Sequence, residues 1–148
     1  MKFFKVDSNL TKKQCEVLLE SLSSVEIEEL ESLDIISDDI EYDGLITSYI
    51  ICNDYTITKV ESFLTRKNVN YNLKDISIDI LVGKISLKNT TFEKQTDKFI
   101  EEFLTVDIVL DKINESGVES LTEIDKKWLK SSDNIITSTW TKLMKSVR

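Results

Sequence analysis

The carboxylates of residues 26–43 are the side chains whose type and spacing most suggest a chemical role. Between Lys13 and Lys59 the sequence has twelve acidic residues and no basic one, so residues 14–58 carry a charge of −12. The remainder of the chain sums to +4, and the whole 148-residue chain to −8. Such a one-sided field repels nucleic-acid phosphates and attracts basic proteins. We therefore expect a partner protein with a basic surface and no direct binding of nucleic acid.

We predict that this binding surface lies in the acidic segment, with Tyr42 or Tyr49 as an aromatic anchor. Its acidic members are Glu26, Glu28, Glu29, Glu31, Asp34, Asp38, Asp39, Glu41 and Asp43. Immunity proteins and inhibitors that cover a basic surface of their target work on this physical principle, and we expect a small bacterial or phage protein of that kind. The alternative interpretation is that the acids only keep one face soluble, and the sequence leaves both open.

The segment Asp39–Gly44 also begins like a calcium-binding loop. Oxygen-bearing side chains occupy its first, third and fifth positions and glycine its sixth, but the twelfth position, which should be a bidentate glutamate, is Ile50. An Asp-Gly pair between alternating apolar residues is instead typical of a type I′ hairpin. We therefore predict a hairpin here, and no metal or other cofactor.

The inventory of nucleophiles and bases does not favour an enzyme. The chain has no histidine, which excludes the usual Ser-His and Cys-His pairs. Cys15 and Cys52 lie in apolar runs without C-x-x-C spacing, as expected of buried thiols in a reducing compartment. The three glycines, Gly44, Gly83 and Gly117, are too far apart to form a phosphate-binding loop. We expect a non-enzymatic protein.

The elements that must position these residues follow from periodicity. Residues 2–6 suit a strand, and Thr11 to Gln14 fits a capping box before an amphipathic helix. Residues 24–37 fit a helix and a strand equally well. Strands at 38–43 and 45–52 flank the Asp-Gly turn, and a helix covers 56–67. In the strand that follows, the apolar residues change from odd to even positions. This change predicts a bulge or break at Lys74-Asp75.

This order of elements predicts an α+β fold. A strand, a helix, a hairpin, a helix and a strand match the ferredoxin-like split βαβ arrangement, in which two helices cover one face of a four-stranded antiparallel sheet. The rest of the chain reads as a group of helices, and Gly117 ends one of them. We predict a sheet domain at 1–84 and a helical region at 85–148 that docks on it, because no Pro/Gly/Ser-rich linker separates them.

One helical segment carries a family resemblance. The residues from Val106-Asp107-Ile108-Val109-Leu110 through Gly117 and on to Lys127-Trp128-Leu129 follow the pattern I/V-L-D-K-I-x-x-x-G-x-x-S-L-T. This stretch of roughly 25 residues resembles the short helical segment at the C-termini of bacterial rhomboid-family membrane proteins. The resemblance implies a helix-turn-helix packing unit of bacterial origin, and no function comes with it.

A second functional interpretation uses the C-terminal helices. Trp128 and Trp140 fall on apolar helix faces, so the chain could instead be a structural or assembly protein that forms a homodimer or joins a larger complex through them. The N-terminus lacks the apolar run of a secretory signal, and no apolar stretch is long enough to cross a bilayer. We therefore expect a cytoplasmic protein without membrane partners.

Overall fold

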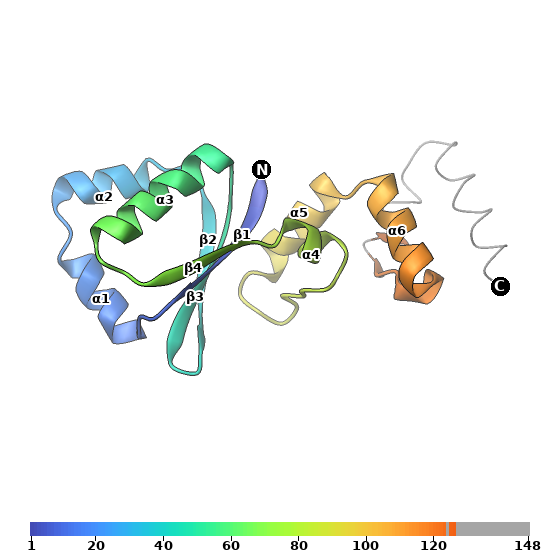
Figure 1. Cartoon of the computed structure of the whole chain (residues 1–148), viewed down its shortest axis with the longest axis horizontal. Helices are drawn as coiled ribbons and strands as arrows, with labels where there is room; N and C mark the ends of the chain where they lie inside the picture. The colour runs from blue at the N-terminus through green and yellow to red at the C-terminus, as the bar shows by residue number, and fades with distance from the viewer. Residues whose placement is uncertain (124, 127–148) are drawn as a thin grey trace. The chain divides into compact units, whose positions relative to one another are not determined.

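The computed structural model describes residues 1–123 and 125–126 (Figure 1). It divides the chain into two compact units, Met1–Ser77 and Ile78–Arg148. The boundary therefore falls after Ser77, earlier than the division after residue 84 expected from the sequence.

The first unit is a four-stranded antiparallel sheet with three helices. Its strands have the order β2-β3-β1-β4, and every neighbouring pair is antiparallel. The predicted α+β class is confirmed, while the ferredoxin-like arrangement stays a prediction. In chain order the elements are β1 (Lys2–Ser8), α1 (Lys12–Glu20), α2 (Ser24–Glu31), β2 (Ile36–Tyr42), β3 (Leu45–Cys52), α3 (Asp54–Arg66) and β4 (Tyr71–Asp75).

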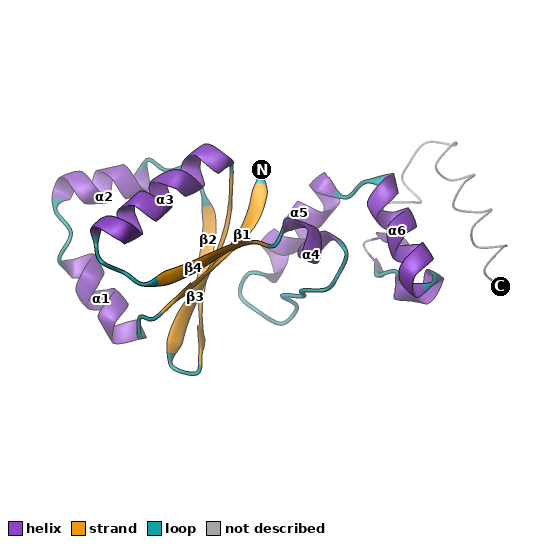
Figure 2. Ribbon diagram, viewed as in Figure 1, coloured by secondary structure: helices purple, strands orange, loops and turns teal. Residues whose placement is uncertain are grey.

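The three helices lie against one face of the sheet (Figure 2). Alternate residues of β1 and β3 point into a buried cluster on that face, formed by Phe4, Val6, Ile50, Cys52 and Ile57. These residues lie on the same face because side chains alternate along each strand and residues paired across two antiparallel strands share one face. The predicted capping box that starts α1 is confirmed: the Thr11 hydroxyl accepts from the Gln14 N–H, and the Gln14 side chain accepts from the Thr11 N–H.

The Asp-Gly turn connects β2 and β3 as predicted. Asp43 and Gly44 have φ of 51° and 81°, the positive values that both central residues of a type I′ turn require. Tyr42 and Leu45 close the hairpin as its last paired residues. The segment is therefore a hairpin rather than an ion-binding loop.

The ambiguous segment 24–37 contains both alternatives in succession. It folds as α2 over Ser24–Glu31 and then enters β2 at Ile36. Ser23 starts the helix with a capping box, in which its hydroxyl accepts from the Glu26 N–H and the Glu26 carboxylate accepts from the Ser23 N–H. This box fixes the helical start that the apolar spacing alone leaves undecided.

The apolar residues change from odd to even positions after Lys74, and this change marks the end of β4. Instead of a bulged strand, the chain forms a short helix, α4 (Ser77–Leu81). The Asp75 carboxylate accepts hydrogen bonds from the Ser77 N–H at 2.9 Å and the Ser77 hydroxyl at 2.6 Å. Ile76, between the strand and the helix, and Ile80, within the helix, are both buried. Of the two alternatives predicted at Lys74-Asp75, a bulge or a break, the structure has the break, because local capping by Asp75 starts a helix.

In the second unit, α4 is followed by α5 (Glu93–Phe103), α6 (Val106–Ser116) and a 3₁₀ turn at Val118–Ser120. Gly117 ends α6 with a φ of 78°, as predicted. The predicted helix faces around Trp128 and Trp140 lie outside the described residues. Among the residues that the structure describes, no helix is long and apolar enough to cross a membrane.

Candidate functional site

The predicted binding residues separate into two groups in the structure. One group belongs to α2 and the loop after it, and the other to the β2–β3 hairpin. The α2 group comprises Glu26, Glu28, Glu29, Glu31 and Asp34, and the hairpin group comprises Asp38, Asp39, Glu41, Tyr42, Asp43 and Tyr49.

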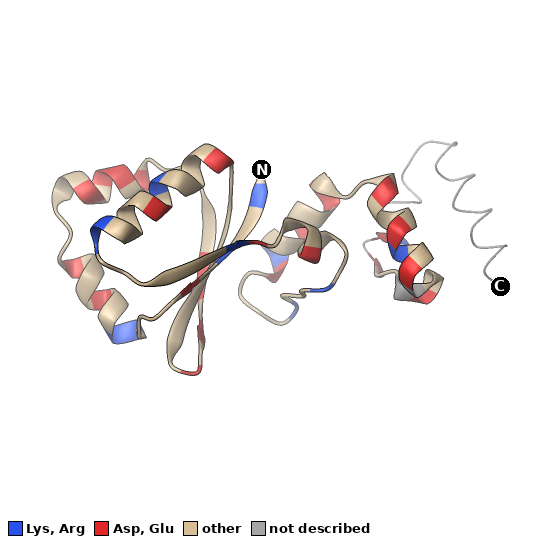
Figure 3. Ribbon diagram, in the orientation of Figure 1, with Lys and Arg blue, Asp and Glu red and all other residues tan. Residues whose placement is uncertain are grey.

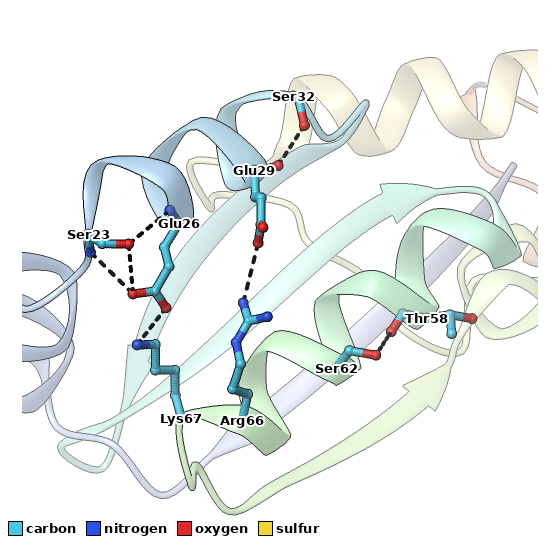
Figure 4. Close-up of polar contacts among 8 residues, drawn as sticks. All are labelled: Ser23, Glu26, Glu29, Ser32, Thr58, Ser62, Arg66 and Lys67. Atoms are coloured by element: carbon cyan, nitrogen blue, oxygen red, sulfur yellow. Dashed lines mark hydrogen bonds and ion pairs between the residues drawn. The ribbon is translucent and has the colours of Figure 1, made fainter.

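Two acids of the α2 group are paired within the molecule (Figure 4). Glu26 Oε2 lies 2.5 Å from Lys67 Nζ, and Glu29 Oε2 lies 3.4 Å from an Arg66 guanidinium nitrogen. The hydrogen bond from Lys67, and next to it the Ser23 N–H, lower the pKa of the Glu26 carboxyl. Glu26 and Glu29 thus attach α2 to the end of α3, and the cations there partly compensate their negative charges.

The net charge of residues 14–58 does not reveal this pairing, because the two cations lie outside that segment. Figure 3 shows acidic α2 beside the basic C-terminal end of α3. The sequence signal available was a pair of adjacent cations, Arg66 and Lys67, at the end of the predicted helix over 56–67. What a sequence does not show is that this end folds back onto the acidic segment.

Most acids of the hairpin group lie exposed at the edge of the sheet. Asp39, Glu41 and Asp43 are exposed, and no ion pair to them occurs within the described residues. Asp39 Oδ1 accepts a hydrogen bond of 2.6 Å from the Ser48 hydroxyl, which orients this carboxylate without neutralising it. Glu28, Glu31 and Asp34 of the α2 group are likewise exposed and make no ion pair in the described part of the chain.

The two candidate aromatic anchors differ in access. Tyr42 is 46% exposed on β2, whereas Tyr49 is only 4% exposed on β3. The Tyr49 ring meets the Phe3 ring edge to face, with centroids 6.4 Å apart. Burial, followed by a side-chain hydrogen bond with Tyr42, raises the pKa of Tyr49. Tyr49 therefore belongs to the interior, and of the two predicted anchors Tyr42 is the one exposed to solvent.

The first unit also contains two thiols and a groove between two of its helices. Burial raises the pKa of both Cys15 and Cys52, which disfavours the nucleophilic thiolate. A groove of about 440 Å³ separates α2 from α3. The hydroxyls of Ser32 and Ser62 on its wall donate to carbonyl oxygens of their own helices, at 2.7 and 3.0 Å (Figure 4). No group of three or more metal-ligating side chains occurs among the described residues.

No protein-family model, no curated protein and no solved structure matches the chain. The rhomboid-like segment and the ferredoxin-like arrangement therefore stay predictions from the sequence.

Proposed function

We propose that this chain is a non-enzymatic protein-binding module, of the immunity or inhibitor kind, that acts in the cytoplasm. Its acidic hairpin edge, defined as Asp38, Asp39, Glu41 and Asp43, contacts a basic surface on another protein. Tyr42 adds an exposed aromatic side chain at the same place.

The observation that carries this proposal is the contrast between Glu26 and Glu29, which are paired, and the acids of the hairpin edge. The fold compensates Glu29 with Arg66, the last residue of α3, and Glu26 with Lys67, the residue after it. At the hairpin, by contrast, Asp39, Glu41 and Asp43 crowd onto one strand and its turn without a compensating cation among the described residues. Uncompensated like charges repel each other, and a basic partner relieves that repulsion and is steered toward it.

The test is affinity capture from an extract of the native cell, with bound proteins released by increasing salt. We expect a basic protein to be retained at low salt and released as salt screens the charges. A double variant, Asp39→Lys/Glu41→Lys, should lose that protein. The matched control is Glu101→Lys/Glu102→Lys, which makes the same change in net charge at two exposed residues of α5. Equal retention by both variants, or release that ignores salt, would contradict the proposal.

A further inference from the structure

The outer side of β2 is an open edge of the sheet. β2 pairs with β3 on one side only. No strand of the described residues pairs with its other side. With seven residues, β2 is also the longer of the two edge strands, since β4 has five. An edge of this length exposes a row of backbone donors and acceptors that can pair with another strand.

The hairpin geometry determines which backbone groups point outward. A two-residue type I′ turn makes Tyr42 and Leu45 a hydrogen-bonded pair, and such pairs alternate along an antiparallel ladder. The N–H and C=O groups of the intervening residues, Ser37, Asp39 and Glu41, therefore face away from β3. In agreement, the Asp39 N–H donates to the side chain of the preceding Asp38 at 2.9 Å rather than to the ladder. An incoming carbonyl oxygen can replace that local acceptor.

The side chains of β2 present different chemistry on the two faces of the sheet. Ile36, Ile40 and Tyr42 share one face with Asp38 among them, and Ile36 and Tyr42 are 49% and 46% exposed. Ser37, Asp39 and Glu41 share the other face and are exposed. A strand added to this edge would place its own alternate residues beside these two rows. The complementary strand is apolar on one face and basic on the other.

The same charges argue against a second copy of this chain as the occupant. Pairing β2 with β2 of another copy would bring two sets of Asp38, Asp39, Glu41 and Asp43 together, and like charges across a strand pair are destabilising. Charged edge residues are a common means by which proteins prevent self-pairing. Charge complementarity therefore selects a foreign, basic strand.

Building on the proposed function, we propose that the outer edge of β2 binds an extended segment of the partner by strand addition. The segment alternates Lys or Arg with aliphatic residues. Its backbone pairs with Ser37, Asp39 and Glu41, its cations lie beside Asp39 and Glu41, and its aliphatic side chains cover Ile36, Ile40 and Tyr42. Main-chain hydrogen bonds supply affinity in this mode of recognition, and the alternating side chains supply specificity.

The probe is an eight-residue peptide of alternating lysine and valine, titrated into the full chain at low salt and followed by fluorescence anisotropy. A second peptide of the same sequence carries N-methyl groups on the alternate backbone nitrogens that would pair with β2. N-methylation leaves the charge unchanged and removes the strand's donors. We expect it to weaken binding by about tenfold or more, the equivalent of losing two or three hydrogen bonds.

Variants of β2 itself test the same pairing without a change to the peptide. Ser37→Pro removes an outward N–H without changing the charge, at an edge position where proline is tolerated. We expect it to weaken binding of the lysine-valine peptide, whereas Ser37→Thr, which keeps the N–H, should bind like the parent chain. Circular dichroism of both variants establishes that each is folded.

The outcomes separate this inference from the proposed function. If the N-methylated peptide binds as tightly as the unmodified one, and both respond to salt, strand addition is wrong while a basic partner still fits. Failure of the lysine-valine peptide to bind at low salt also overturns strand addition. The proposed function is tested separately, by the salt-dependent capture from a cell extract. If an alternating glutamate-valine peptide binds equally well, both proposals fail.

Discussion

Lys67 Nζ lies 2.5 Å from Glu26 Oε2, and this contact joins the residue after α3 to the first turn of α2. The same carboxylate closes the capping box with Ser23, so one side chain both starts α2 and attaches it to α3. Both side chains are about four-fifths covered. This ion pair therefore organises the acidic segment rather than serving a partner.

Glu26→Gln should lower the midpoint of urea unfolding at neutral pH. Glutamine can still serve the capping box but cannot pair with Lys67. Because the folded pKa of Glu26 is lowered, its stabilising effect is fully present above the ordinary pKa of a glutamate and is lost as pH falls through the folded pKa. The difference between Glu26→Gln and the parent chain should therefore disappear in acid. Glu28→Gln, an exposed change in the same helix, is the control, and an equal effect of both variants would contradict this assignment.

Asp125→Asn should destabilise the second unit strongly. Lys112 and Asp125 form an ion pair at 2.5 Å with side chains only 8% and 1% exposed. Removing one charge of a buried pair leaves the other uncompensated, which typically costs about 3–5 kcal/mol. Hydrogen exchange of α6 amides measures this loss.

Lys126→Met provides the control for the buried pair. Lys126 pairs with Glu123 at 3.7 Å on the exposed surface, where such pairs contribute only about 0–1 kcal/mol. Equal protection of α6 in Asp125→Asn and Lys126→Met would show that the buried pair is not what stabilises this unit.

Gly44→Ala should cost about 1 kcal/mol of folding stability, because an L-residue resists a positive φ. The φ of Gly44 is 81°, and no atom lies within 4 Å of the position that a Cβ would occupy, so the effect comes from the backbone alone. Asp43→Asn is the control, because asparagine is favoured at this turn position. Thermal unfolding of both variants distinguishes them, and an unchanged midpoint for Gly44→Ala would argue against the type I′ turn.

Both thiols should react slowly with a disulfide reagent in the native chain, and Cys15 should react before Cys52. Burial raises the pKa of each, so little thiolate is present at neutral pH. Cys52 is fully buried in the sheet, while Cys15 is half-buried on α1. Rates should rise with pH, and Cys15→Ser should remove the faster phase. Rapid reaction of Cys52 in the native state would contradict its burial.

Local signals predicted much of the fold. The Asp43-Gly44 turn, the capping box at Thr11 and the helix end at Gly117 each depend on a few neighbouring residues, and the structure contains all three. The Ser23–Glu26 box was also readable and would have settled the helix in residues 24–37. Apolar spacing left that segment undecided, because this short helix has no buried residue to mark its inner face.

The candidate site was only partly predictable, because its charges are sorted by contacts between distant residues. Glu26 and Glu29 meet cations 41 and 37 positions away in the sequence. The edge position of β2 depends on the order of all four strands. Neither relationship has a local pattern, so the sequence identified the acidic segment but not which of its members are compensated.

The central position of β1 has a consequence for how the first unit forms. This strand precedes every element that covers it, and its neighbours β3 and β4 come from around residues 50 and 73. During synthesis, one edge of β1 therefore waits for β3, around residue 50, and its other edge stays unpaired until β4 has been made as far as Asp75. Such distant pairing slows folding and leaves apolar strands open to wrong partners in the meantime. The chain is then most vulnerable to aggregation before its fourth strand arrives.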